Sequence, residues 1–327
     1  MYEEFFGLTS RPFQLAPDAR YFFGSRGHTQ ALAHLTYGLA QGEGFIVITG
    51  EIGAGKTTLI DHLMGTLQSQ LYRAARVPTT QLAPGGLLRM VLSAFDLRQR
   101  STDKAGMLRQ FAEFFAESQA AGRRLLLVVD EVQNLPFASL EELRMLSNLA
   151  TGTGAPLQTC LVGQPQFRDI IMSAKAEQLR QRIVTFYHLG TLQENEIRSY
   201  IEHRLRMASW TGQPSFDADS FSAIYRHTAG VPRRINLLCS RLLLQAYLNE
   251  SDGITGEDVE LVARESDIDH RPLSNGFAAA HDGQPETAGD LAEVIQRLGQ
   301  LEQKLLLQET ALKDTVNVLD RSGHLWR

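Results

Sequence analysis

The chain has 327 residues, a net charge of -5 and two cysteines. This length accommodates two domains and an appendage, and the slightly acidic charge provides no general attraction to nucleic acid. The N-terminus is acidic at Glu3 and Glu4, whereas a signal peptide begins with basic residues. No apolar run approaches the roughly 20 residues that are needed to cross a bilayer. Cys160 and Cys239 lie in apolar stretches without metal-ligand spacing, which indicates buried thiols in a reducing, cytoplasmic compartment.

The first 190 residues contain apolar runs of strand length that alternate with helical patterns. We predict helices at residues 28–39, 87–95 and 104–121, and strands at residues 45–49, 72–77, 125–129, 157–162 and 183–188. Ser139 and Glu142 form a capping box that predicts the start of a further helix. Buried strands that alternate with helices are typical of a parallel sheet covered on both faces. We therefore predict an α/β core domain over residues 1–190.

From about Thr191 the pattern is purely helical. Thr191 and Glu194 form a second predicted capping box, helical patterns follow at residues 216–227 and 233–248, and Thr255 caps a last helix. These patterns predict an all-α lid domain over residues 191–268, attached to the carboxyl end of the sheet domain.

A predicted linker and a C-terminal helix follow the lid. Residues 269–289 are rich in Gly, Pro, Asn and Asp, which indicates a linker. Leucines at positions 291, 298, 305, 312 and 319 lie seven residues apart and predict an amphipathic, coiled-coil-like helix over residues 290–320. We expect this helix to mediate self-association or docking to a partner. The alternatives are a helix that packs on its own domain and a marginally stable free helix.

A glycine-rich segment lies between the first strand and the next helix, and consists of Gly50, Glu51, Ile52, Gly53, Ala54, Gly55, Lys56 and Thr57, with Thr58 following. A strand, a glycine-rich turn, a lysine, a hydroxyl and a helix form the arrangement that binds a nucleoside triphosphate. The glycines bring backbone N–H groups against phosphate oxygens, and Lys56 supplies positive charge to the β- and γ-phosphates. Thr57 reaches Mg²⁺, and the helix start adds its positive dipole end. We therefore expect ATP and Mg²⁺ as cofactors.

Polar side chains follow two of the other predicted strands. Asp130 ends its strand at the sheet edge of the phosphate loop, where its carboxylate can hold Mg²⁺ through water, and Glu131 is suited to polarise the attacking water. Gln164 follows the next strand and can place an amide beside the water and the γ-phosphate. The alternatives are a simple strand exit for the two acids and a turn residue before Pro165 for Gln164.

Three arginines are candidates for stabilising charge in the transition state. Arg180 and Arg182 precede the last predicted strand, and one of them can point across a subunit boundary as an arginine finger. The alternative is two solvated arginines at a helix end, and the sequence does not choose between the two residues. Arg233 begins a helix of the lid, where it can fold over the phosphates and report the nucleotide state.

Several motifs together resemble the AAA+ ATPases of the general-secretion-pathway ATPase A (ExeA-like) family, in particular the secretion ATPases of exosortase and PEP-CTERM loci. The resemblance covers about residues 1–265. It rests on Arg11-Pro12-Phe13, residues 42–50, Asp130-Glu131-Val132-Gln133-Asn134-Leu135, residues 143–148, Gly163-Gln164-Pro165-Gln166-Phe167 and residues 230–236.

The resemblance implies a P-loop AAA+ ATPase that forms homo-oligomers, with ATP near the subunit boundary. It implies work at the cytoplasmic side of an envelope export system, beside inner-membrane or polysaccharide-assembly proteins. It also implies that Pro12 and Phe13 lie near the adenine, although in sequence terms they can equally be core residues. Larger members carry a membrane span and a peptidoglycan-binding domain. This chain shows neither, so we expect its leucine-periodic tail and its partners to provide attachment at the membrane.

We therefore predict an ATP-hydrolysing oligomer that drives or licenses the assembly of an export or exopolysaccharide machine. One alternative is a DNA-associated regulator like the transposition ATPases, although the chain has no dense Lys/Arg stripe. Another alternative is a nucleotide-gated scaffold with little turnover, which would not need the Glu131 carboxylate.

Overall fold

The computed structural model describes residues 2–16, 18–78, 86–148 and 157–269. Its largest sheet contains β1 (Phe45–Gly50), β2 (Tyr72–Pro78), β3 (Arg124–Asp130), β4 (Gln158–Gly163) and β5 (Ile183–Leu189), in the order β2-β3-β4-β1-β5. All neighbouring strands of this sheet are parallel. Every residue of β1 and β4 is buried, which explains why these strands are continuous apolar runs in the sequence. The predicted parallel sheet is confirmed.

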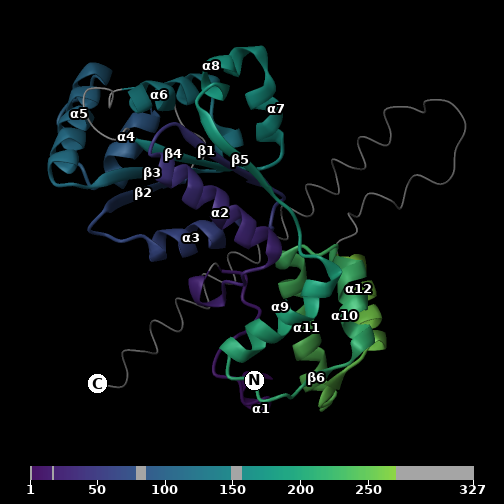
Figure 1. Cartoon of the computed structure of the whole chain (residues 1–327). Helices are drawn as coiled ribbons and strands as arrows, with labels where there is room; N and C mark the ends of the chain where they lie inside the picture. The colour runs from purple at the N-terminus through teal and green to yellow at the C-terminus, as the bar shows by residue number, and fades with distance from the viewer. Residues whose placement is uncertain (1, 17, 79–85, 149–156, 270–327) are drawn as a thin grey trace, which may run out of the picture. The chain divides into compact units, whose positions relative to one another are not determined.

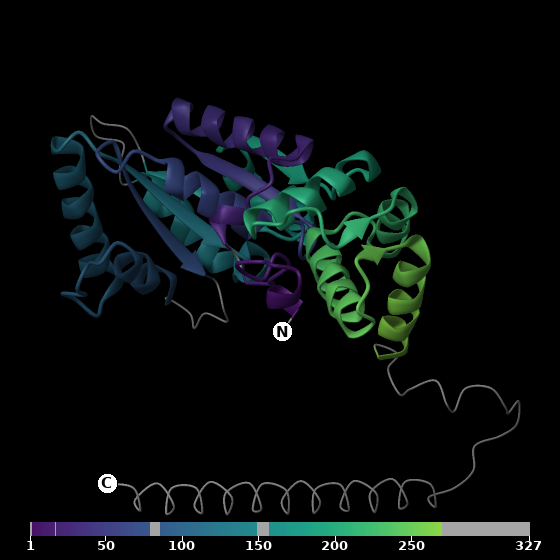
Figure 2. The same ribbon diagram turned by 90° about the horizontal axis from the view of Figure 1, so that it is seen from below.

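Helices cover both faces of this sheet, and the strands lie between the purple α2 and the blue α5 (Figure 1, Figure 2). One face packs on α2 (Arg26–Gln41) and α3 (Lys56–Thr66). The other face packs on α4 (Gly86–Ala94), α5 (Lys104–Ala120), α6 (Phe137–Asn148), α7 (Gln166–Met172) and α8 (Glu177–Arg180). Successive residues of β1 alternate between the two cores, because side chains of a strand point to opposite faces of a sheet.

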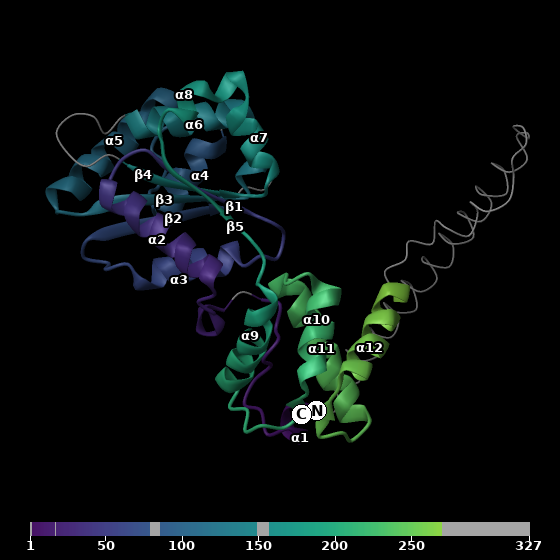
Figure 3. The same ribbon diagram turned by 45° about the vertical axis from the view of Figure 1, so that its right-hand side comes forward.

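A third core lies among α9 (Glu194–Met207), α10 (Ala218–Thr228), α11 (Pro232–Leu248) and α12 (Gly256–Asp269) (Figure 3). The sequence did not predict the short parallel pair β6 (Ser215–Phe216) and β7 (Gly253–Ile254) in this region. The N-terminal segment, with α1 (Tyr2–Phe5) and the 3₁₀ turn η1 (Ala19–Tyr21), also contributes here, because Phe6, Leu8 and Phe13 are buried in the same core. The first residues of the chain therefore pack with the helical region, although we expected them in the sheet domain.

Two predicted helix starts differ from the structure. Helix α6 begins at Phe137, so Ser139 is a buried residue of its first turn and not its cap; the Ser139 N–H donates to the Pro136 carbonyl. Helix α9 has its capping box at Gln193 and Glu196, two residues after the predicted one. In both cases the helix start is set by the residue at which the backbone turns, and a sequence pattern locates that residue only to within a few positions.

The remaining predictions on organisation have different outcomes. Thr255 does cap α12, since its Oγ1 accepts from the Asp258 N–H at 3.3 Å. Cys160 and Cys239 are buried free thiols, as predicted, and burial raises the pKa of each. The predicted linker, apart from Asp269 at the end of α12, and the predicted C-terminal helix lie outside the described residues. Within the described ranges, none of the helices combines the length and the apolarity needed to span a membrane.

Candidate functional site

The glycine-rich loop joins the carboxyl end of β1 to the start of α3. Gly53 and Gly55 have φ values of +83° and +96°, in the left-handed region that favours glycine. Gly50 is required for a different reason, since a Cβ there would lie 2.6 Å from the Leu189 carbonyl oxygen. These glycines therefore allow both the turn and a close approach of the loop backbone to its neighbours.

Lys56, the first residue of α3, is buried at the base of the loop. Its Nζ donates to the carbonyl oxygens of Gly50 at 2.6 Å and Glu51 at 2.9 Å. Burial lowers the pKa of Lys56, and the nearby carboxylates of Glu131, Asp130 and Glu51 oppose this effect. Because its two acceptors are neutral carbonyls of the loop itself, the ammonium group can exchange them for phosphate oxygens.

The carboxyl ends of β1, β3 and β4 lie at the same edge of the sheet, because these neighbouring strands are parallel. Asp130 ends β3 there and is buried. Its Oδ1 accepts from the Glu131 N–H at 2.9 Å, and its Oδ2 contacts the guanidinium of Arg76 on β2. Arg76 also bonds Asp61 on α3 at 2.7 Å. Both carboxylate oxygens of Asp130 are thus engaged by protein groups.

Thr57 and Asp130 provide the hydroxyl and the carboxylate that suit a Mg²⁺ ion. Thr57 lines the cavity described below, whereas Asp130 is outside the set of described lining residues and has both oxygens bonded. This donor set fits Mg²⁺ if Thr57 binds the ion directly and Asp130 contacts it through water, as we expected from the sequence.

Glu131 has a left-handed backbone, with φ +49°, which is uncommon for a residue with a side chain. One carboxylate oxygen, Oε2, accepts from the amides of Gln133 at 2.6 Å and Gln164 at 3.1 Å. Gln164 follows the end of β4, so the structure brings the two predicted site residues together across neighbouring strands. Gln133 was not predicted as a site residue.

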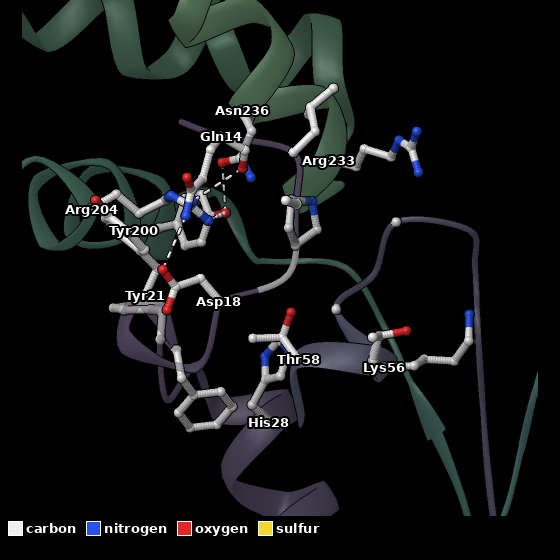
Figure 4. A pocket seen from close by; sticks show the side chains of 18 of the residues that line it. Gln14, Asp18, Tyr21, His28, Lys56, Thr58, Tyr200, Arg204, Arg233 and Asn236 are labelled. Atoms are coloured by element: carbon white, nitrogen blue, oxygen red, sulfur yellow. Dashed lines mark hydrogen bonds between the residues drawn. The ribbon is translucent and has the colours of Figure 1, made fainter. Parts of the chain in front are cut away.

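The cavity has a volume of about 220 Å³ and is lined by described residues of the loop, the N-terminal segment, α9 and α11. Figure 4 shows Lys56 and Arg233 toward one side of it, and Gln14, Tyr200 and Arg204 toward the other. Arg233 lies in the first turn of α11, and its backbone N–H donates to the Gly53 carbonyl at 3.2 Å. The start of α11 therefore rests directly on the phosphate loop.

Pro12 and Phe13 are buried and lie outside the set of lining residues. Phe13 packs in the helical core, and the Pro12 carbonyl accepts from the Arg204 guanidinium at 2.6 Å. The residues that follow them, Gln14, Leu15, Ala16 and Asp18, line the cavity instead. The segment thus borders the cavity through side chains other than those of Pro12 and Phe13.

Arg180 and Arg182 lie at the opposite edge of the sheet from the loop. The Arg182 carbonyl accepts from the N–H of Phe45, the first residue of β1, at 2.8 Å. Its guanidinium bonds Ser147 at 3.0 Å, and that of Arg180 bonds the Met172 carbonyl at 3.5 Å. Neither arginine belongs to the described residues that line this cavity.

Comparisons with known proteins fit this geometry. Residues 39–171 match the family described as "AAA domain". The ORC2 protein of Aeropyrum pernix, solved as ADPNP and ADP complexes, aligns with a TM-score of 0.58 over 78% of this chain and 71% of that chain, at 17% identity. Cdc6p of Pyrobaculum aerophilum aligns with a TM-score of 0.60 over 78% and 70% of the two chains, at 16% identity. The structure therefore has the P-loop AAA+ fold, and residues 39–171 match an AAA domain. The fold predicted from the sequence is therefore confirmed.

The similarity to a further protein extends beyond residues 39–171. The chain is 36% identical over 269 residues to General secretion pathway protein A of Aeromonas hydrophila. This alignment covers 81% of the chain and 48% of the relative, so the chain spans about half the length of that protein. The identity supports the predicted resemblance to the ExeA-like AAA family.

Beside the AAA domain, the helical region contributes a buried arginine that sequence reasoning missed. The Arg204 guanidinium donates to Pro12 O, to Tyr200 Oη at 3.2 Å and to Gln14 O at 3.3 Å. It also lies 4.8 Å above the centre of the Tyr21 ring. Arg204 thereby holds the N-terminal segment against α9. The signal was present, because Arg204 shares the apolar helix face of Ile197 and Ile201, where a charged residue is unexpected.

His28 is a second missed residue, in the first turn of α2. Its Nδ1 lies 2.7 Å from Ser25 Oγ, and its ring meets Phe22 edge-on. A Cβ on Gly55 would lie 2.7 Å from His28 Nε2, so this imidazole packs directly against the phosphate loop. Burial lowers the pKa of His28 to about 4, and the ring is therefore neutral at pH 7.

Proposed function

We propose that this protein is a Mg²⁺-dependent ATPase that acts in an envelope secretion system. One observation carries the proposal. The phosphate loop with its buried Lys56 opens on a cavity at the sheet edge where Asp130 ends β3 and Glu131 follows it. A loop that binds phosphates, a carboxylate for the ion and a second carboxylate for the water are the parts that ATP hydrolysis needs.

Each residue has a distinct task in this proposal. The loop N–H groups and Lys56 bind the phosphates, and Thr57 with Asp130 would hold Mg²⁺, which neutralises charge that develops on the phosphate oxygens. Glu131 accepts a proton from the attacking water, and Gln164 bonds the Glu131 carboxylate at 3.1 Å and keeps it oriented. Arg233 lies where the helical region meets the loop, so its guanidinium can respond to the γ-phosphate.

The site needs a second subunit if an arginine finger completes it. Arg180 and Arg182 lie at the sheet edge opposite the phosphate loop of their own chain, so they can reach only the nucleotide of a neighbouring copy. We therefore propose a homo-oligomer with ATP near the subunit boundary. Arg180 is the stronger candidate, because its guanidinium lies 3.5 Å from the Met172 carbonyl, whereas that of Arg182 bonds Ser147 at 3.0 Å.

The proposed biological role rests on the 36% identity to General secretion pathway protein A and on the motif resemblance given above. We propose that the chain works in the cytoplasm, peripheral to the inner membrane through its partners. We further propose that these partners belong to an export or exopolysaccharide system of the exosortase and PEP-CTERM type. The predicted helix at residues 290–320 is the proposed attachment segment.

The test measures ATP hydrolysis against protein concentration, with and without double-stranded DNA, while light scattering follows assembly. We expect turnover per subunit to rise with assembly and to be the same with and without DNA. Glu131→Gln should retain ATP binding and lose turnover, whereas Glu265→Gln, at an exposed position of α12, should behave like the unchanged protein. Undiminished turnover of Glu131→Gln would refute the role of this carboxylate, and stimulation by DNA would favour the transposition-like regulator. Absence of turnover at every concentration would favour a scaffold.

A further inference from the structure

Gln133 links two residues of the proposed hydrolytic site. Its Nε2 donates to Glu131 Oε2 at 2.6 Å, and its Oε1 accepts from the Gln164 backbone N–H at 2.9 Å. The Gln164 side-chain amide donates to the same Glu131 oxygen at 3.1 Å. The three residues thus form a closed ring of hydrogen bonds between the ends of β3 and β4.

The surrounding backbone is adapted to this ring. Gln133 lies in the 3₁₀ turn η2 (Val132–Asn134), directly after Glu131 with its φ of +49°. A Cβ on Gly163 would lie 2.8 Å from Gln133 Oε1, so the amide fits only because β4 ends in glycine. A left-handed non-glycine residue is unfavourable alone and persists where its surroundings hold it. Gln133 is one group that holds Glu131 there.

We propose that Gln133 is a positioning residue for hydrolysis, which orients the Glu131 carboxylate and holds it beside Gln164. This inference rests on the proposed function, because it assumes that Glu131 polarises the attacking water. A carboxylate that rotates freely accepts a proton from bound water less effectively than one held in place. Two amide donors on one oxygen fix the plane of the Glu131 carboxyl group. Because Gln133 also accepts from the Gln164 backbone N–H, the same side chain fixes the Glu131 carboxyl group relative to the end of β4.

Gln133 does not contact the nucleotide cavity itself, since it is absent from the described residues that line it. Its removal should therefore leave ATP binding intact and affect turnover alone. A merely structural glutamine would instead change the stability of the fold, and a binding residue would change affinity. Separate measurements of turnover, ATP affinity and stability therefore distinguish a positioning role from a structural role and from a binding role.

The experiment compares Gln133→Met, Gln133→Glu and the matched control Gln70→Met in the full chain. Gln133→Met keeps the side-chain length and removes both hydrogen bonds. Gln133→Glu keeps an acceptor for the Gln164 N–H but directs a second carboxylate at Glu131. Gln70 is exposed between α3 and β2, away from the site. The measurements are steady-state turnover, the affinity for a fluorescent ATP analogue with Mg²⁺, and thermal unfolding.

We expect turnover to fall about 10- to 100-fold in Gln133→Met, part of the roughly 10²- to 10⁴-fold that a positioned proton acceptor contributes. Turnover should fall further in Gln133→Glu, because the new carboxylate would lie against the like charge of Glu131. Analogue affinity should stay within about twofold, and Gln70→Met should match the unchanged protein in every measurement. Unchanged turnover in Gln133→Met, or affinity or unfolding temperature falling in step with turnover, would overturn the inference.

Glu131→Gln, measured in parallel, separates the two hypotheses. If Glu131→Gln is inactive while Gln133→Met retains full turnover, only the positioning role fails. If Glu131→Gln retains turnover, or the unchanged protein has none, the proposed function fails, and the positioning role fails with it.

Discussion

A methyl group at Gly53 should separate the phosphate loop from the helical region. Gly53 has φ +83°, and an added Cβ would lie 2.5 Å from Arg233 Cβ and 3.4 Å from Val231 Cγ1. The position of Arg233 Cβ is fixed by the backbone, so a rotamer change cannot remove the collision with this atom. Gly53→Ala should therefore push the start of α11 away and weaken the bond from the Arg233 N–H to the Gly53 carbonyl.

Two terms contribute to the expected loss of stability. A left-handed conformation costs a residue with a Cβ about 1–2 kcal/mol. Forcing an extra methyl group into a packed contact costs about 1–3 kcal/mol. Gly122 offers a matched control, because its φ is +71° and a Cβ there would meet nothing within 4 Å. Gly122→Ala should carry only the first term, so the two variants should differ by about 1–3 kcal/mol.

The assay is urea unfolding of the nucleotide-free protein, followed by circular dichroism. Nucleotide is omitted because Gly53 also belongs to the proposed phosphate site, and binding would stabilise the folded state unequally in the variants. Gly53→Ala should unfold at lower urea concentration than Gly122→Ala. Equal free energies of unfolding would mean that the helical region does not rest on the loop at this residue, and the steric reasoning would be refuted.

Two further predictions concern buried charge. The free energy of unfolding should be largely retained above pH 6.5 and fall by up to about 3 kcal/mol toward pH 4, because the pKa of His28 is lowered to about 4 in the folded protein and unfolded histidine titrates near 6.5. His28→Gln should lose this part of the pH dependence in urea unfolding, and an unchanged dependence would contradict the assignment. Arg204→Met should destabilise the protein by about 2–4 kcal/mol in the same assay, because the carbonyls of Pro12 and Gln14 would lose their donor. Arg198→Met, at an exposed ion pair, should cost less than about 1 kcal/mol, and equal costs would contradict the conclusion that Arg204 holds the N-terminal segment against α9.

Features that depend only on residues close together in the chain were predictable without the structure. The phosphate loop is one contiguous segment, so its glycines, lysine and threonine are recognisable without tertiary information. Strands β1, β3 and β4 were predictable because burial on both faces requires continuous apolar runs. Asp130 and Gln164 were expected at one edge, because the carboxyl ends of neighbouring parallel strands must meet there.

The contacts between side chains that are distant in the chain were not predictable in this way. Arg76 reaches Asp130 because β2 lies beside β3, and Arg204 holds Pro12, which is 192 residues away in the chain. No local pattern encodes such pairs, since they depend on strand order, register and the packing of one core against another. The N-terminal segment belongs to the helical core for the same reason: its aromatic side chains require apolar partners, and those partners appear only when the chain has folded.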